Sequence, residues 1–194
     1  LNLQRVRHGL PILADDVIRP QASHGARGLL GVGFDLHPDD PHFASMREEF
    51  LQLYADNVCR YSRPFPGILD LLDALEARQL KWGVVTNKPA CFTEPLMSIL
   101  DLAERAACIV SGDTCPQSKP HPAPMLAAAE LCGVTPAQCL YLGDAERDIQ
   151  AARAASMPAL VAAWGYLDAT DKPHTWGAHA EIHRPLETLD YLTP

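Results

Sequence analysis

From residue 64 to its end, the chain alternates short apolar runs with stretches that have the periodicity of amphipathic helices. The runs KWGVVTN, ACIVSGD, CLYLGD and ALVAAWG lack polar alternation, which is typical of strands buried on both faces. A weaker strand, HAEIHR, and a last helix from Pro185 follow them. Strict alternation of strand and helix predicts βα units on a parallel sheet with helices on both faces. The sequence therefore predicts an α/β fold with a doubly wound parallel sheet over residues 64–194.

Residues 1–63 differ from the rest because they are helix-like throughout. The segment LNLQRVRHGLP has the pattern of the end of an amphipathic helix that stops at Gly9. Short helices broken near Pro20 and Ser23 are predicted next, and PDDPHFASMREEFLQLYADNVCRYS predicts a longer helix with one apolar face. We therefore expect a helical domain over 1–63, including the remnant of a first core helix, and a separate core over 64–194.

Charge and cysteine usage narrow the classes of partner and the compartment. A net charge of −8 argues against nucleic acid or an anionic membrane as the main partner, because both select basic surfaces. No apolar run approaches the roughly 18 residues that a membrane span needs. The six cysteines contain no CxxC pair, which favours packing thiols in a reducing cytoplasm over disulfides. A small anionic substrate remains compatible with this composition, since it responds to the local field of its pocket.

Polar residues follow each of the predicted strands. Thr86 and Asn87 come after the first strand, Asp113 after the second and Asp144 after the third. A loop between the second and third strands carries Lys119. Because ligands of open parallel sheets bind outside the carboxyl ends of the strands, we expect these side chains to converge on one rim.

These residue types suit phosphoryl chemistry. A threonine hydroxyl and the amides near a helix N-terminus can hold phosphate oxygens. A lysine supplies a compact positive charge against a phosphate and its developing charge. Carboxylates hold Mg²⁺ together with waters and substrate oxygens. Asp148 follows Asp144 by one helical turn, so both can face the same site.

Each residue also has a simpler role that the sequence leaves open. Thr86 or Asn87 can cap the following helix, and Lys119 can be an exposed loop lysine. Asp144 can be a helix N-cap, and Asp148 can be a surface residue that pairs with a neighbouring arginine. The order of these residues, each at its own strand end, favours a shared site over five separate roles.

Three strings carry a resemblance to a known family. TNKP, SKPHP and GDAERD, in this order and on these elements, resemble the second, third and fourth motifs of the haloacid dehalogenase superfamily. WGVVTNKPACFTEPL, VSGDTCPQSKPHPAPML and CLYLGDAERDIQAARAA resemble its phosphoglycolate phosphatase-like branch, which is close to the N-acetylmuramic acid 6-phosphate phosphatases. The resemblance covers nearly the whole chain. It implies a Rossmann-like core with a helical cap.

The resemblance also implies an activity. It implies a Mg²⁺-dependent phosphatase that works through an aspartyl-phosphate intermediate on a small phosphorylated acid, phosphoglycolate first. N-acetylmuramic acid 6-phosphate or another sugar phosphate is the alternative substrate. By motif, Thr86 and Asn87 would hold the phosphoryl group, and Lys119 would neutralise the nucleophile and the phosphate. Asp144 would bind Mg²⁺, and Asp148 would support that metal site or the lysine.

Two further features follow from the same resemblance. The string SHGAR resembles a cap loop that meets substrate, so Arg27, with Ser23 and His24, would face the organic part of the substrate. The family's first motif, DxDGT, which carries the nucleophile, does not occur in the sequence. The nearest string is GFDLHPDD, where we expect Asp35 to be a loop residue. We expect the nucleophile on an upstream segment and little activity from this chain alone. The alternative to an enzyme is a non-catalytic module that binds phosphate or has a regulatory role.

Overall fold

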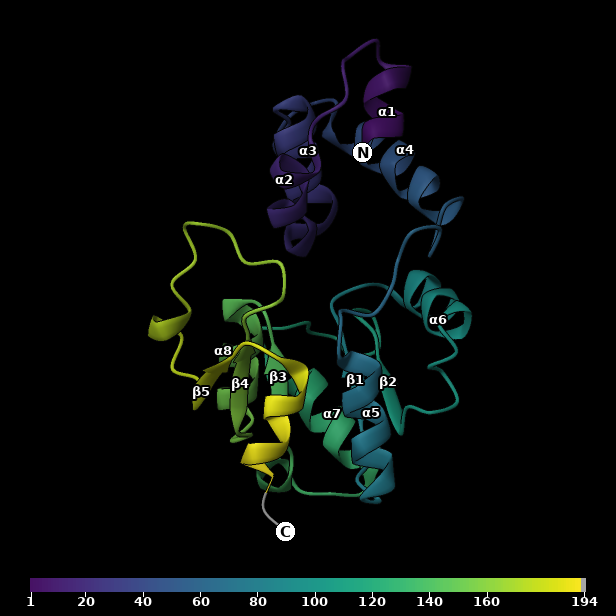
Figure 1. The fold of residues 1–194 in the computed structure, drawn as a ribbon. Helices are drawn as coiled ribbons and strands as arrows, with labels where there is room; N and C mark the ends of the chain where they lie inside the picture. The colour runs from purple at the N-terminus through teal and green to yellow at the C-terminus, as the bar shows by residue number, and fades with distance from the viewer. Residues whose placement is uncertain (193–194) are drawn as a thin grey trace. The chain divides into compact units, whose positions relative to one another are not determined.

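The structure, a computed structural model, describes residues 1–192 and forms two compact units (Figure 1). The first unit contains Leu1–Arg60 and the short segment Tyr166–Thr170. The second unit contains Tyr61–Gly165 and the chain from Asp171 onward. The role of the first unit as a substrate cap stays a prediction. Within residues 1–192, no helix combines the length and apolar character needed to cross a membrane.

The first unit is helical, in agreement with the pattern of its sequence. Its helices are α1 (Asn2–Arg7), α2 (Asp15–Ile18), the 3-10 helix η1 (Arg19–His24), α3 (Gly25–Phe34) and α4 (Phe43–Ala55). Leu30 on α3 and Phe50 and Leu53 on α4 are buried and form the apolar centre of this unit. The first helix ends just before Gly9, whose positive φ of 71° suits a residue without a Cβ.

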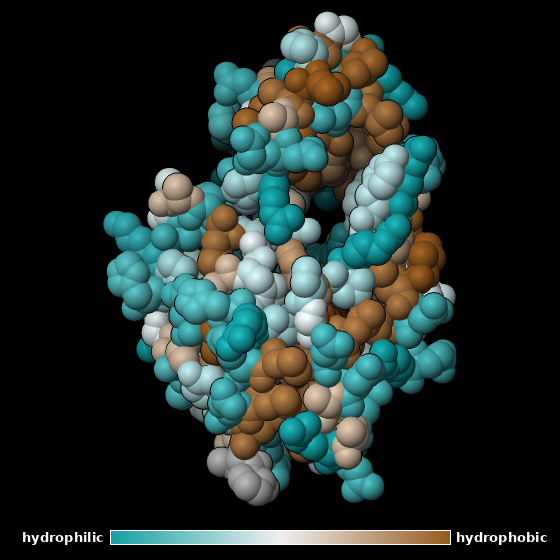
Figure 2. Space-filling model, in the orientation of Figure 1, coloured by the Kyte–Doolittle hydropathy of each residue, from teal (hydrophilic) through white to brown (hydrophobic). Residues whose placement is uncertain are grey.

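Helix α1 buries polar side chains and exposes apolar ones. Arg5 is buried, and its guanidinium donates to the carbonyl oxygens of Gly33 and, at 2.8 Å, of Pro11. Leu3 and Val6 on the same helix are 54% and 59% exposed. Apolar surface on this unit is visible in the view coloured by hydropathy (Figure 2). The unit is therefore stabilised partly by hydrogen bonds from a buried cation rather than by apolar burial alone.

The second unit contains two parallel sheets. Strand β1 (Gly83–Val85) pairs with β2 (Cys108–Val110), while β3 (Tyr141–Gly143), β4 (Ala159–Ala162) and β5 (Ala180–Ile182) form the order β3-β4-β5. Parallel pairing in every ladder confirms the predicted α/β class. Strand β4 has neighbours on both sides and is buried throughout. Strands β1 and β3 each pair with one strand among the described residues, and both keep partly exposed residues.

The helices of the second unit follow the strands as the sequence predicts. They are α5 (Ile68–Ala77), α6 (Ala90–Ile99), α7 (Ala123–Cys132) and α8 (Glu146–Ala154), with 3-10 helices η2 (Pro136–Gln138), η3 (Pro173–Thr175) and η4 (Pro185–Tyr191). Helix α5 packs Leu72 against Met97 of α6 and Leu102. Helix α7 packs Ala128 against β2. The last element, predicted as a helix from Pro185, is the 3-10 helix η4.

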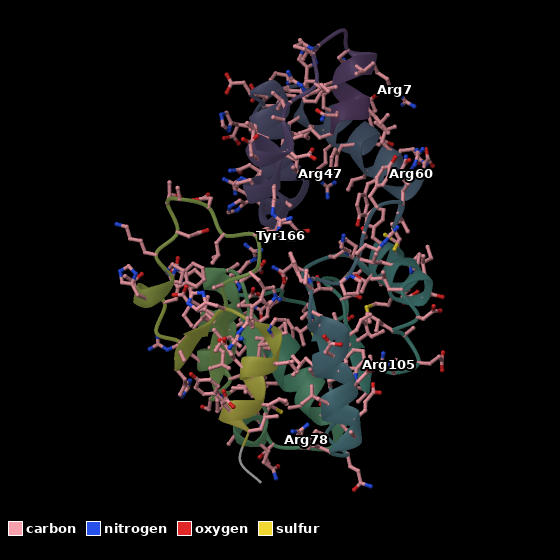
Figure 3. All side chains as sticks on the ribbon, in the orientation of Figure 1. Arg7, Arg47, Arg60, Arg78, Arg105 and Tyr166 are labelled. Atoms are coloured by element: carbon pink, nitrogen blue, oxygen red, sulfur yellow. The ribbon has the colours of Figure 1, made fainter. Side chains whose placement is uncertain are left out.

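A surface ion-pair group joins α5 to the segment before β2. Arg105, labelled beside α5 in Figure 3, donates to Asp73 at 2.5 Å and to Glu76 at 2.9 Å. The indole of Trp82 donates to the same Glu76 carboxylate at 2.9 Å. Hydrogen bonds from Arg105 and then Trp82 lower the pKa of Glu76 below its ordinary value. These exposed contacts fix the edge of the unit and contribute little to its stability individually.

Candidate functional site at the strand ends

The residues after β1 bind the loop that carries the lysine. The side-chain amide of Asn87 donates from Nδ2 to the backbone oxygen of Lys119 at 2.9 Å, and the backbone N–H of Lys119 donates to Asn87 Oδ1 at 3.0 Å. Both ends of the amide therefore contact the backbone of one residue that lies 32 positions later. Thr86 extends the pairing of β1, because its N–H donates to the Val110 oxygen at 2.9 Å. Its Oγ1 accepts a hydrogen bond from the N–H of Lys88 at 3.1 Å.

The simpler role of Thr86 or Asn87 as a helix cap is not observed. Helix α6 begins at Ala90, and the N–H of Ala90 donates to Oδ1 of Asp113 at 2.9 Å. The carboxylate that follows β2 therefore caps α6, where an acidic group also complements the positive end of the helix. Asp113, which the sequence placed on the rim with the site residues, has a structural contact there.

The ammonium group of Lys119 is buried and fully bonded. Lys119 is 8% exposed, and its Nζ donates to Val85 O at 2.7 Å, Tyr141 Oη at 2.9 Å and Asp148 Oδ1 at 2.8 Å. An ammonium has three N–H donors, so each of them has an acceptor. Asp148 is 5% exposed, and the two charges form a buried ion pair. The alternatives of an exposed loop lysine and a surface aspartate are therefore wrong.

The two carboxylate oxygens of Asp148 have different partners, one on Lys119 and one at the start of its own helix. While Oδ1 contacts Lys119, Oδ2 accepts a hydrogen bond from the N–H of Ala145 at 3.2 Å. Ala145 is the N-cap of α8, so Asp148 satisfies the N–H of the residue that begins its own helix. Both oxygens of Asp148 are engaged by protein groups, which favours a supporting role over direct metal binding.

Two glycines allow the carboxylates to approach the strand ends. A Cβ atom placed on Gly143 would overlap the Cβ of Asp148, and a Cβ on Gly165 would overlap the Cβ of Asp144. Gly143 ends β3, and Gly165 follows β4. Because a real Cβ would displace the aspartates, glycine at these positions is required for close contact. Asp144 and Asp148 thus lie against neighbouring strand ends of one sheet.

The donor set fits a magnesium ion held by few protein ligands. Among the described residues, no group of three or more His, Cys, Asp or Glu side chains is arranged to hold a metal. Mg²⁺ often takes one or two carboxylates and completes its shell with waters and substrate oxygens. Of the two predicted ligands, Asp148 is held by Lys119 and by the N–H of Ala145, whereas Asp144 lies against Gly165. Direct binding of Mg²⁺ by Asp144 stays a prediction.

The predicted substrate-contacting residues lie in the first unit. Ser23 and His24 end η1, and Arg27 follows on α3. Arg27 and His24 are exposed, so both side chains are accessible to a ligand. Nearby on η1, the guanidinium of Arg19 lies 4.9 Å from the ring centroid of Tyr166, which Figure 3 labels. The contribution of these residues to the strand-end site stays a prediction.

Asp35 occupies the loop position that the sequence predicts for it. It follows α3 in a left-handed conformation with φ of 55°, and its side chain is fully exposed. An exposed residue at a helix end has none of the surroundings of Asp144 or Asp148. Asp35 is therefore not part of the strand-end cluster.

Tyr141 is a site residue that the sequence analysis treated only as part of a strand. Its hydroxyl accepts from Lys119 Nζ at 2.9 Å and donates to Val85 O at 3.1 Å. Burial, followed by the negative charges of Asp148 and Asp144, raises the pKa of Tyr141 well above its ordinary value. The phenol is therefore neutral and can both donate and accept. A tyrosine within a buried apolar run needs a partner for its hydroxyl, and this is the signal that could have identified it.

Comparison with known proteins gives consistent matches. The family described as haloacid dehalogenase-like hydrolase matches residues 34–162. An N-acetylmuramic acid 6-phosphate phosphatase from Pseudomonas aeruginosa is 40% identical over 188 residues, covering 97% of this chain and 83% of that protein. A phosphoglycolate phosphatase from Xylella fastidiosa is 42% identical over 168 residues, covering 87% of this chain and 73% of that protein.

A solved structure supports the fold. The crystal structure of a predicted phosphoglycolate phosphatase from Haemophilus somnus matches with a TM-score of 0.83. It covers 98% of this chain and 87% of that chain at 24% sequence identity. At 24% identity this match supports the fold alone, whereas the family assignment rests on the more similar sequences.

Proposed function

The chain belongs to the haloacid dehalogenase-like hydrolases, and on that premise we propose that it hydrolyses the phosphate ester of a small acid. The observation that carries the proposal is the buried Lys119–Asp148 pair beside Thr86 and Asp144 at the carboxyl ends of parallel strands. The names of the similar proteins, which are phosphatases of phosphoglycolate and of N-acetylmuramic acid 6-phosphate, support the same class of reaction.

We assign roles to the chain's own residues from their contacts. The hydroxyl hydrogen of Thr86 is the donor for an oxygen of the phosphoryl group, while its Oγ1 is held by the N–H of Lys88. Lys119 is a fixed positive charge near the strand ends that offsets the charge of the phosphate. We propose that Asn87 acts through the backbone of Lys119, which its side-chain amide holds, rather than by side-chain contact with phosphate.

The proposal includes Mg²⁺ as the cofactor. Asp144 would bind the ion directly, and Asp148 would keep Lys119 in place beside it. When bound, the ion would offset the negative charge that develops during phosphoryl transfer. Gly165 supports this assignment, because it allows Asp144 to lie against the end of β4 without obstruction.

The attacking carboxylate is proposed to enter from a strand between β1 and β3. We propose that an aspartate attacks phosphorus, breaks the bond to the substrate's alcohol oxygen, which leaves as the alcohol, and forms an aspartyl-phosphate that water then hydrolyses to free phosphate. Strands β1 and β3 each pair on one side among the described residues and remain partly exposed, whereas β4 is buried throughout. A parallel strand added there would end beside Lys119 and Asp144. The 194 residues contain no DxDGT motif, so we assign the nucleophile to a residue outside them.

We propose that the first unit selects the substrate. Arg27 is exposed, and its charge complements a substrate carboxylate, with Ser23 and His24 as neighbouring polar groups. Phosphoglycolate is the first candidate substrate, and N-acetylmuramic acid 6-phosphate is the second because of the 40% identical relative. The cytoplasm is the proposed compartment, which agrees with six cysteines that are all free thiols.

The test is an assay of the complete gene product with both candidate substrates. We expect Mg²⁺-dependent release of phosphate, with kcat/KM for the preferred substrate at least about tenfold above that for the other. Failure on both, in a folded protein, would contradict the proposal and favour a non-catalytic phosphate-binding module. A parallel assay of the 194-residue chain should show little turnover, and full activity of that chain would contradict the assignment of the nucleophile.

A pair of variants tests the role of the first unit. Arg27→Ala should raise KM for the preferred acid by about tenfold while leaving KM for p-nitrophenyl phosphate within about twofold. Arg47→Ala is the matched control, since Arg47 is another exposed arginine of this unit, on α4 (Figure 3). Equal effects of Arg27→Ala on both substrates would exclude a role in recognising the organic part of the substrate.

A further inference from the structure

Two thiols of the second unit are in contact where α7 packs against β2. Cys108 starts β2 and Cys132 ends α7, 24 positions later, and their Sγ atoms are 3.5 Å apart. Gly83 leaves room for this arrangement, because a Cβ atom there would overlap the Sγ of Cys108. A strand and a helix that pack together therefore hold the two sulfurs side by side.

This pair lies at the other end of the strands from the candidate functional site. Cys108 pairs in register with Gly83, the first residue of β1, whereas Thr86 and Asn87 follow the last residue of β1. The contact involves β2 and α7, on the side of β1 that is already paired. A strand added at the other edge of β1 would therefore not come between the two sulfurs.

The two thiols differ in their access to solvent. Cys108 is 8% exposed, whereas Cys132 is half-buried. Burial raises the pKa of the Cys108 thiol to about 12, so this thiol keeps its proton at neutral pH and reacts poorly with reagents in solution. Cys132 offers the sulfur that a small oxidant can reach, and the second sulfur lies directly beside it. If both thiols served only as small apolar side chains, an oxidant would not join them.

We propose that Cys108 and Cys132 form a redox modification site, at which a peroxide joins the two sulfurs in a reversible disulfide. The sulfurs are already in van der Waals contact, so rotation of two short side chains brings them together. Formation of this bridge does not depend on phosphatase activity. In a reducing cytoplasm such a bridge is transient, and thiol reductants reverse it.

The reaction takes place in two steps. The thiolate of Cys132 attacks one oxygen of hydrogen peroxide, the O–O bond breaks, and hydroxide leaves and becomes water. Cys132 is then a sulfenic acid. The sulfur of Cys108 attacks the sulfur of Cys132, the S–O bond breaks, and the hydroxyl group leaves as water with the proton of Cys108. The two thiols lose two electrons in total, and these electrons reduce one peroxide to two waters.

The bridge would close a segment of the chain that carries a site residue. Residues 108–132 run from the start of β2 to the end of α7 and include Lys119. Closing this loop restricts the unfolded chain, which raises stability if the bridge fits the native fold. Oxidation should therefore have a structural consequence that is measurable apart from the bridge itself.

The first test is disulfide mapping of the folded complete gene product after treatment with hydrogen peroxide. We expect the Cys108–Cys132 bridge to be at least about tenfold more abundant than any other bridge, because only neighbouring sulfurs resolve a sulfenic acid quickly. Dithiothreitol should remove it. Absence of this bridge while exposed Cys91 is oxidised would overturn the proposal.

Cys139 is the competing partner for Cys132 and supplies the control. Burial, followed by the charge of Cys132, raises the pKa of Cys139, so this third thiol lies near the pair. In urea-unfolded protein the shorter loop should make Cys132–Cys139 the preferred bridge over Cys108–Cys132. In folded Cys139→Ala, the yield of Cys108–Cys132 should stay within about twofold of the parent. A folded parent that forms mainly Cys132–Cys139 would overturn the proposal.

The second test compares the urea midpoints of the reduced and oxidised protein. The bridge should raise the midpoint by at least about 0.5 M. Cys108→Ala, treated with the same peroxide, should show no rise, which separates the bridge from oxidation elsewhere. An unchanged or lower midpoint in bridged protein would show that the bridge does not fit the native fold and would overturn the proposal.

Discussion

The buried ion pair between Lys119 and Asp148 makes a quantitative prediction for Asp148→Asn. This substitution removes the negative charge and leaves a buried ammonium, 8% exposed, with two neutral acceptors, Val85 O and Tyr141 Oη. Breaking one side of a buried pair costs about 3–5 kcal/mol. The two remaining acceptors put the expected loss at the lower end, about 3 kcal/mol. The amide oxygen of asparagine can still accept from the N–H of Ala145, so the start of α8 should persist.

The assay is urea unfolding followed by circular dichroism. With an m value of about 2 kcal/mol per molar urea, a loss of about 3 kcal/mol lowers the midpoint by about 1.5 M. Replacing the lysine as well, in Lys119→Met with Asp148→Asn, should recover at least about half of the loss, because the uncompensated charge is gone. The matched control is Asp73→Asn on the exposed pair with Arg105, for which we expect less than about 1 kcal/mol.

Two outcomes would refute this reasoning about the ion pair. The first is a loss for Asp148→Asn that is no larger than the loss for Asp73→Asn, which would mean that the buried charge is not paired as described. The second is a double variant whose loss equals the sum of the two single losses. That additivity would show that Lys119 and Asp148 do not interact energetically.

Two further predictions concern a glycine and a buried thiol. Gly165→Ala should displace Asp144 and raise the Mg²⁺ concentration for half-maximal activity of the complete gene product by about tenfold. Gly31→Ala, the control at an uncrowded position, should leave that concentration unchanged. Equal effects of the two substitutions would contradict the close contact between Gly165 and Asp144. Burial raises the pKa of the Cys108 thiol to about 12, so iodoacetamide at pH 8 should modify exposed Cys91 and spare Cys108, as read by mass spectrometry. Between about pH 9 and pH 12 the unfolded chain loses the Cys108 proton while the folded protein keeps it, so the free energy of unfolding should fall as the pH rises through this range. A free energy of unfolding that does not change with pH, together with rapid alkylation of Cys108, would contradict the burial of this thiol.

The sequence predicted much of the fold because the fold follows from local patterns. Apolar runs and helical periodicity located the strands of the second unit and its helices, and the order of elements predicted parallel pairing. The division into two sheets was not predicted. The pairing of a strand depends on which other strands lie beside it. A run of apolar residues shows that a strand is buried but not which strand it pairs with. The final helix from Pro185 is present, and its 3-10 geometry was not specified in advance, since a helix pattern does not distinguish α from 3-10 geometry over so few residues.

The candidate site was predicted by position but not by contact. Lys119 and Asp148 were expected near one rim, and they lie together there as a buried pair. The role of Asn87 in holding phosphate stays a prediction, and the contact of its side-chain amide with the backbone of Lys119, 32 residues away, was not predicted. Tyr141 was not singled out, because its hydroxyl contacts a strand 56 positions earlier. Such roles depend on partners that are distant in sequence, and no local pattern records them.

The most direct test of the central claim is phosphate release by the complete gene product and its Asp144→Asn variant. The phosphorylated substrate is phosphoglycolate or N-acetylmuramic acid 6-phosphate, with Mg²⁺ present or removed by chelation. We predict Mg²⁺-dependent release by the parent protein and a loss of at least about 10²-fold in the variant, with its unfolding midpoint nearly unchanged. Activity of the folded variant within about tenfold of the parent would contradict the assignment of Asp144 and, with it, the phosphatase site at the strand ends.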